Sequence, residues 1–132
     1  MIEPIHTSTL NGQPVRFFKS SLDRPDFPWH AAEDLNAAGK LPRVMRRQFM
    51  HGLFKDWRRE IKQAVVDGEL ITLAPHFVGE VMAEIIDGCH PGFHGAYIKA
   101  AIAAVNVVTA GMPPAEQIAY MLAAHKGGSG ME

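Results

Sequence analysis

The sequence lacks the features that mark secreted and membrane-spanning proteins. Its single cysteine, Cys89, excludes an intramolecular disulfide and suits a reducing compartment. No apolar run approaches the roughly 20 residues that cross a bilayer. Residues 1–20 also lack the basic start and apolar block of a signal peptide. We therefore expect a cytoplasmic protein without a membrane partner.

Catalytic signatures are missing as well. The chain has no glycine-rich phosphate loop, no nucleophile elbow and no His/Glu zinc-protease pattern. Asp23 and Asp26 form a carboxylate pair by sequence proximity alone. The second such pair, Glu33 and Asp34, is explained by the preference of a first helical turn for acidic residues. We expect no catalytic residues, no cofactor and no enzymatic activity.

A metal site is not expected either, although Cys89, His90 and His94 are close in sequence. A structural zinc site needs four ligands, usually paired at recurring intervals, and this group supplies only three. The pattern is typical of a loop that leads into a helix. An enzyme that uses these three residues is a weaker alternative.

The remaining composition is that of a globular protein. The chain has 132 residues, of which 47% are hydrophobic and 20% charged. This size permits one buried core without metal or disulfide support. We expect a single domain over residues 1–126 and a flexible tail over residues 127–132, where Gly127-Gly128-Ser129-Gly130 lies.

Local patterns predict an α+β fold. Two expected strands flank Asn11-Gly12, a dipeptide that tolerates the positive φ of a tight hairpin turn. The expected strands are residues 6–10, 15–18 and 70–73, and the expected helices are residues 31–38, 42–66, 75–87, 93–109 and 114–125. The predicted architecture is a small N-terminal antiparallel sheet, formed by the hairpin, packed against four or five helices.

The later helices should contribute their aliphatic side chains to the core. The helix that Pro75 opens should direct Phe77, Val78, Val81, Met82, Ile85 and Ile86 inward. The final helix should direct Ile118, Met121 and Leu122 inward.

Positive charge is concentrated between Lys40 and Lys62. This stretch holds eight of the thirteen Lys and Arg residues and two acidic residues, a formal charge of +6. The rest of the chain holds five basic and twelve acidic residues, a formal charge of −7. The net charge of −1 therefore conceals a dipolar protein, and local charge governs binding to phosphates or to an acidic protein surface.

Helical periodicity divides the basic stretch into two faces. The apolar face consists of Met45, Phe49, Leu53, Trp57, Ile61 and Ala64, and the basic face consists of Lys40, Arg47, His51, Lys55, Arg58, Arg59 and Lys62. Arg43 precedes the basic face and Arg46 falls off it. Because Trp57 lies on the apolar face, we expect it to pack in the core rather than to stack on bases. His51-Gly52 lies in the middle of this segment. If the helix breaks at this glycine, the segment forms two helices with a turn between them.

Residues 15–35 resemble the N-terminal domain of the BRO family, which also occurs in phage and prophage antirepressors. The resemblance depends on Val15-Arg16-Phe17-Phe18, a loop, and Pro28-Trp29-His30-Ala31-Ala32-Glu33-Asp34-Leu35. His30 replaces the usual aromatic residue and Glu33 the usual Lys. Glu69-Leu70-Ile71-Thr72-Leu73 is similar to a later strand of that family. The resemblance implies a small α+β domain with DNA-binding or regulatory activity, carried by a virus, phage or integrated element.

Two functions follow as hypotheses. The first is a regulatory protein that binds nucleic acid, with duplex DNA favoured, mainly through its phosphates. The contacting residues would be Lys40, Arg43, Arg46, Arg47, His51, Lys55, Arg58, Arg59 and Lys62. The alternative is a protein-interaction module, an inhibitor or adaptor, whose basic face docks on an acidic protein. A homodimer would suit the first hypothesis because two half-sites raise affinity and specificity.

Overall fold

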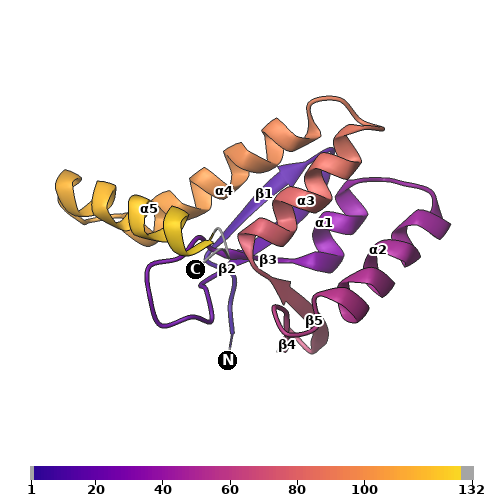
Figure 1. Cartoon of the computed structure of the whole chain (residues 1–132), viewed down its shortest axis with the longest axis horizontal. Coiled ribbons are helices and arrows are strands. Elements are labelled where there is room, and N and C mark those ends of the chain that lie inside the picture. Colours follow the sequence, from indigo (N-terminus) through magenta and orange to yellow (C-terminus); the bar gives the residue numbers. More distant parts are fainter. Residues whose placement is uncertain (1, 129–132) are drawn as a thin grey trace.

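The computed structural model describes residues 2–128 and confirms the α+β fold (Figure 1). The strands are β1 (His6–Leu10), β2 (Gln13–Phe18), β3 (Trp29–Ala31), β4 (Lys62–Val66) and β5 (Glu69–Ala74). The helices are α1 (Ala32–Ala38), α2 (Arg43–Asp56), α3 (His76–Asp87), α4 (Phe93–Thr109) and α5 (Pro114–Gly128). All five strands join one antiparallel sheet in the order β1-β2-β3-β5-β4, so the sheet is larger than the predicted hairpin.

Two tight turns set the register of the outer strands. Asn11 and Gly12 join β1 to β2 with φ values of 53° and 81°, as the sequence predicts. Asp67 and Gly68 join β4 to β5 in the same way, with φ values of 50° and 78°. Two successive positive φ values match the turn that best continues the twist of an antiparallel hairpin.

The second hairpin corrects the prediction of one helix over residues 42–66. Helix α2 ends at Asp56, and Lys62–Val66 form strand β4 instead. The β-branched pair Val65-Val66 and the Asp67-Gly68 turn favour a strand, and pairing with β5 supplies the hydrogen bonds that a longer helix would have made. Gly52 does not break α2, because it lies inside the continuous helix.

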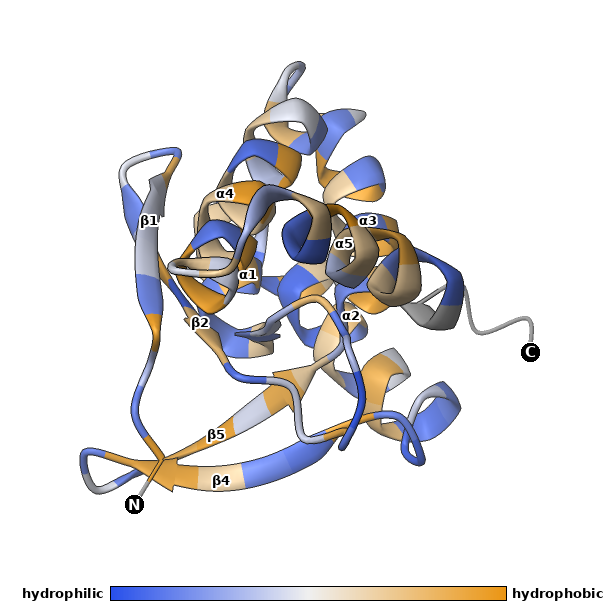
Figure 2. Ribbon diagram, turned by 90° about the vertical axis from the view of Figure 1, so that its left-hand side faces the viewer, coloured by the Kyte–Doolittle hydropathy of each residue, from blue (hydrophilic) through white to orange (hydrophobic). Residues whose placement is uncertain are grey.

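Alternation along the strands places apolar side chains on both faces of the sheet. Phe17 belongs to the main core cluster together with residues of α1, α3 and α4, whereas Phe18 belongs to a second cluster with Trp29, Ile71 and others. In Figure 2 the helices lie on one side of the twisted sheet, with β1 and the β4–β5 hairpin along its margins. The fold is therefore a helical layer on one sheet face, with a smaller apolar cluster on the other.

Helix α1 is joined to the sheet by its two acidic residues. Glu33 accepts hydrogen bonds from the backbone N–H of Thr72 (2.8 Å) and from its hydroxyl (2.7 Å). Asp34 accepts bonds from the backbone N–H and the guanidinium of Arg16. The helix dipole therefore explains only part of the presence of acidic residues at the start of α1. Each carboxylate also accepts hydrogen bonds from one residue of the sheet, in β5 or in β2.

A cluster of aromatic and histidine rings fills the space where α3 and α4 meet the sheet. His30 on β3 is fully buried, and its two ring nitrogens lack hydrogen-bond partners among the described residues. Its ring meets the ring of Tyr97 edge-on at 5.9 Å, and the Tyr97 hydroxyl lies 3.2 Å from His76 Nδ1. Burial lowers the pKa of His30 to about 3, so this side chain is neutral at pH 7.

We expect the protein to lose stability in mild acid because of His30. The unfolded state protonates His30 below about pH 6.5, whereas the folded state resists protonation down to about pH 3. Between these two pH values, each decrease of one pH unit lowers the free energy of unfolding by about 1.4 kcal/mol. Urea titrations at pH 7 and pH 4.5 should show a smaller loss for His30→Leu than for the natural protein. An equal loss in both would mean that His30 is not the group responsible.

Helix α5 differs from the prediction in its orientation. Met121 is half-buried, but Ile118 and Leu122, which we expected inward, are 61% and 67% exposed. The helix is attached through the buried Ala124 and through the Tyr120 hydroxyl, which donates to the backbone carbonyl of Asp26 (3.0 Å). Of the tail predicted at 127–132, Gly127 and Gly128 end α5, and residues 129–132 lie outside the described residues. No helix within residues 2–128 is long and apolar enough to cross a bilayer.

Candidate nucleic-acid interface

Helix α2 lies at one end of the molecule and is held by one face (Figure 1). Leu53 is buried, and Met45, Phe49, Met50 and Trp57 pack partly buried against the main core. Asn36 of α1 donates a hydrogen bond to the backbone carbonyl of Arg46 (3.1 Å). The predicted anchors Phe49, Leu53, Trp57 and Ile61 all contact the core, although Trp57 and Ile61 follow the end of the helix. This attachment leaves the opposite side of α2 open to solvent.

The basic side chains of α2 form a regular row on that open side. Arg43, Arg47, His51 and Lys55 are exposed and spaced four residues apart, so they follow one another along the helix. The row is about 18 Å long at 1.5 Å per residue. Arg46 is exposed beside it. We call Arg43, Arg46, Arg47, His51 and Lys55 the basic face of α2.

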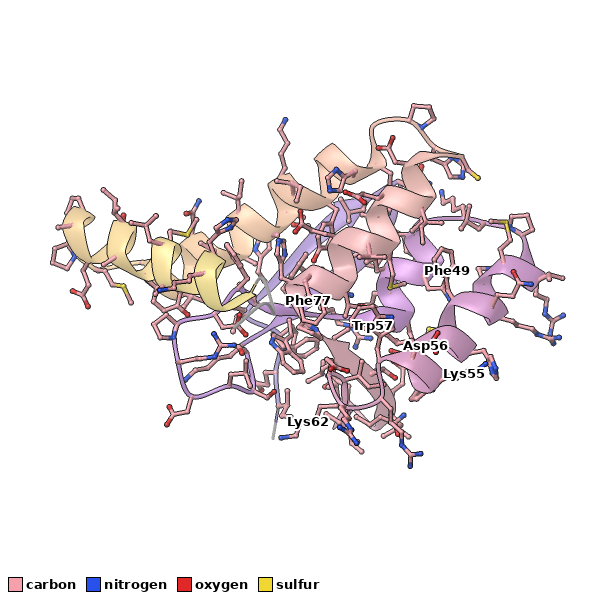
Figure 3. All side chains as sticks on the ribbon, viewed as in Figure 1. Phe49, Lys55, Asp56, Trp57, Lys62 and Phe77 are labelled. Carbon is pink, nitrogen blue, oxygen red and sulfur yellow. The ribbon has the colours of Figure 1, made fainter. Side chains whose placement is uncertain are left out.

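The other predicted contact residues lie outside α2 and therefore do not belong to this face. Arg58 and Arg59 are exposed in the turn that follows α2, and Lys62 begins strand β4. Figure 3 places Lys62 apart from Lys55 on the surface. Lys40 precedes α2 with a left-handed φ of 48°, and its Nζ lies beside Gly12 of the first hairpin turn. The single continuous face predicted for residues 40–62 is therefore wrong, because the helix ends at Asp56.

Charge on the basic face is not neutralised within the described residues. None of the nine predicted contact side chains forms an ion pair there, whereas Arg16 is paired with Asp34 and Glu69. Helix α2 has no acidic residue in its first turn, and its N-cap residue, Pro42, supplies no side-chain hydrogen bond. The positive end of the helix dipole therefore coincides with Arg43, Arg46 and Arg47, an arrangement that a bound anion would stabilise.

Neither tryptophan is free to stack on a base. Trp29 is buried, and its indole N–H donates to Asp26 (3.0 Å). Trp57 is half-buried, and its ring lies 5.5 Å from the ring of Phe77 (Figure 3). Trp57, which we expected in the core, packs against the core but is only half-buried. A contact with nucleic acid would therefore not use a tryptophan for stacking.

The loop residues Cys89, His90 and His94 do not form a ligand cluster. Within the described residues, no group of three His, Cys, Asp or Glu side chains is placed to hold a metal ion. Cys89 is exposed. His94 lies at the start of α4, where its backbone N–H donates to Asp87 (2.9 Å), and its Nε2 faces Glu80 at 3.7 Å.

A cavity that sequence reasoning missed lies between α3, α4 and α5. It measures about 610 Å³ and has apolar walls that include Phe77, Ile98 and Met121. His76, Glu80 and Glu84 line one side at four-residue intervals. Burial lowers the pKa of His76, so its neutral form is favoured beside Glu80. The carboxylates of Glu80 and Glu84 therefore make this wall more suitable for a cation than for a phosphate.

No protein-family model matches the chain, and neither the search of curated proteins nor that of solved structures found a similar protein.

Proposed function

We propose that this protein binds nucleic acid, with duplex DNA as the favoured form, through the basic face of α2. In this role it is a regulatory protein of a phage, virus or mobile element rather than an enzyme. The observation that carries the proposal is the start of α2, where Arg43, Arg46 and Arg47 surround a helix N-terminus without an acidic residue or a side-chain cap. Arg43 and Arg46, in the first turn, each interact unfavourably with the positive end of the helix dipole, by a few tenths of a kcal/mol up to about 1 kcal/mol. A phosphate would satisfy both the arginines and the backbone N–H groups.

The arrangement of charge along α2 supports phosphate contact. The row from Arg43 to Lys55 spans about 18 Å, and duplex DNA carries one negative charge per about 1.7 Å of its axis. The row can therefore face several phosphates at once. Asp56, at the last position, is the only acidic residue of α2, and Glu80 and Glu84 lie on α3. The molecule would thus approach a polyanion with α2 in front.

The resemblance to the BRO N-terminal domain supports the regulatory part of the proposal. The resembling residues include Pro28 and Leu35 and form strand β3 and helix α1. Helix α1 itself is a poor phosphate site, because Glu33 and Asp34 occupy its first turn. The resemblance therefore concerns the class of protein, and α2 supplies the contact surface.

The test removes three charges from the row. Arg43→Ala/Arg47→Ala/Lys55→Ala should weaken binding to a fluorescent mixed-sequence duplex at least tenfold, as measured by anisotropy. Because each phosphate contact contributes about 0.9 to the slope of log K against log salt, that slope should become shallower by about two to three. The titrations should span about 50 to 200 mM salt.

A charge-matched variant provides the control. Lys19→Ala/Arg24→Ala/Lys99→Ala also removes three positive charges from exposed positions, but none lies on α2. It should bind with nearly unchanged affinity and slope. If both triple variants weaken binding equally, net charge rather than the basic face is responsible. If the natural protein does not bind the duplex at all, the proposal is wrong.

An acidic protein partner is the second candidate, and exposed apolar residues favour it. Val44 and Phe54 are 65% and 39% exposed on α2, among the basic side chains. A protein surface with carboxylates around an apolar patch would cover both kinds of side chain, whereas phosphates would leave Val44 and Phe54 uncovered. Such a partner would saturate at a fixed stoichiometry, and the protein would show no general affinity for oligonucleotides.

A further inference from the structure

The outward side of α5 is largely apolar between Ala115 and Ala123. Ala115, Ile118, Ala119, Leu122 and Ala123 are all exposed, and their spacing places them on one face of the helix. The inward side is also largely apolar, with Ala124 buried and Met121 lining the cavity. A helix that is hydrophobic on both sides is normally buried on both sides. Within one copy of the chain, the described residues cover only the inner side.

The position of α5 makes its outer side accessible. Helices α4 and α5 form an antiparallel hairpin that extends beyond the sheet (Figure 1), and the α5 ribbon carries hydrophobic colours in Figure 2. Gly111, with a φ of 87°, lies in the connection between them. Isolated exposed aliphatic residues are ordinary, but a continuous apolar helix face marks an interaction site.

We infer that this face joins a second copy of the same chain, through antiparallel packing of two α5 helices about a two-fold axis. Charge favours this occupant. Glu116 is in the first turn of α5 and Lys126 in the last, both exposed. In an antiparallel pair centred near Met121, Glu116 of each copy lies opposite Lys126 of the other. Nucleic acid is a poorer occupant, because Lys126 is the only Lys or Arg among the described residues of α5.

The size of the side chains also suits close packing of two identical helices. The exposed alanines allow the helix axes to approach to about 8 to 10 Å, and Ile118 of one copy would then pack near Leu122 of the other. A two-fold interface uses the same patch on both subunits, so the patch must be compatible with itself. A face with aliphatic side chains in the middle and opposite charges at its two ends meets this condition.

The experiment measures molar mass by light scattering or sedimentation over a wide range of protein concentration. The natural protein should be a dimer, and Ile118→Glu/Leu122→Glu should raise the dissociation constant at least tenfold while circular dichroism shows an unchanged fold. The control is Val65→Glu, which changes an aliphatic residue of comparable exposure (60%) on β4 and should leave the dimer intact. Ala119→Arg, at another exposed position, should also produce a monomer.

Exchanging the end charges tests the antiparallel arrangement. Glu116→Lys and Lys126→Glu should each weaken the dimer several-fold, and the double variant should restore it. A monomer at every concentration, or a dimer that survives Ile118→Glu/Leu122→Glu and Ala119→Arg, would overturn the inference. A double charge variant no better than the single ones would overturn the antiparallel pairing. These outcomes are independent of DNA binding, because no substituted residue lies on α2.

Discussion

Replacing Gly79 with alanine should destabilise the protein by about 3 kcal/mol, at the upper end of the range for overpacked cores. An added Cβ would overlap the Tyr97 hydroxyl and lie 2.6 Å from Tyr97 Cζ and 2.7 Å from His30 Cε1. Tyr97 and His30 are fully buried, and the Tyr97 hydroxyl is held at 3.2 Å from His76 Nδ1. The rings therefore cannot move aside without breaking other contacts. Urea denaturation would measure the loss as a lower midpoint.

Gly52→Ala is the matched control for Gly79→Ala. Gly52 also lies inside a helix, but an added Cβ would meet nothing within 4 Å. Alanine should therefore stabilise α2 by about 0.5 to 1 kcal/mol, because it restricts the unfolded chain. If Gly79→Ala proves as stable as Gly52→Ala, the close approach of α3 to Tyr97 is wrong.

Removing the Asp34 carboxylate should lower the free energy of unfolding by about 2 to 3 kcal/mol. Its Oδ2 accepts bonds from the backbone N–H (3.0 Å) and Nε (2.8 Å) of Arg16, and its Oδ1 accepts one from Nη2 (3.1 Å). This bidentate pair raises the pKa of Arg16 above its ordinary value. Both side chains are mostly buried, at 22% and 15% exposure, so Asp34→Ala would leave a guanidinium without its main partner.

Glu69→Ala serves as the control for Asp34→Ala because Glu69 is the other partner of Arg16. Its carboxylate lies 3.3 Å from Arg16 Nη2, but the side chain is 67% exposed. Solvent screens such a pair, so its loss should change the free energy of unfolding by less than about 0.5 kcal/mol. Equal effects of the two variants in thermal or urea denaturation would contradict this ranking.

Elements with strong local signals could be predicted from the sequence. The Asn11-Gly12 turn and the helices after Pro75 and Gly92 are found close to where they were expected. The end of α2 was missed because Trp57, Ile61 and Ala64 continue a helical spacing by coincidence. Asp67-Gly68 is compatible with the end of a helix at residue 66, but the same dipeptide is a strong hairpin signal and indicates the turn between β4 and β5.

Interactions between distant parts of the chain could not be predicted from local patterns. Glu33 bonds to Thr72, 39 residues away, and Asp34 bonds to Arg16, 18 residues away. The orientation of α5 is a similar case, because an apolar residue does not reveal whether its own chain or another one covers it. For the candidate interface, charge density correctly predicted exposed basic side chains, but their grouping depended on where α2 ends.

The position of Lys62 on an edge strand affects how the free protein avoids aggregation. Strand β4 is an edge of the sheet, and its Val65 is largely exposed. An edge with unpaired backbone groups and an aliphatic side chain can recruit a strand from another molecule and begin aggregation. The exposed ammonium of Lys62 at the start of this edge resists such pairing, because an added strand would have to cover and desolvate a charged side chain. A residue that the sequence assigned to recognition thus protects the free protein from self-assembly through its sheet.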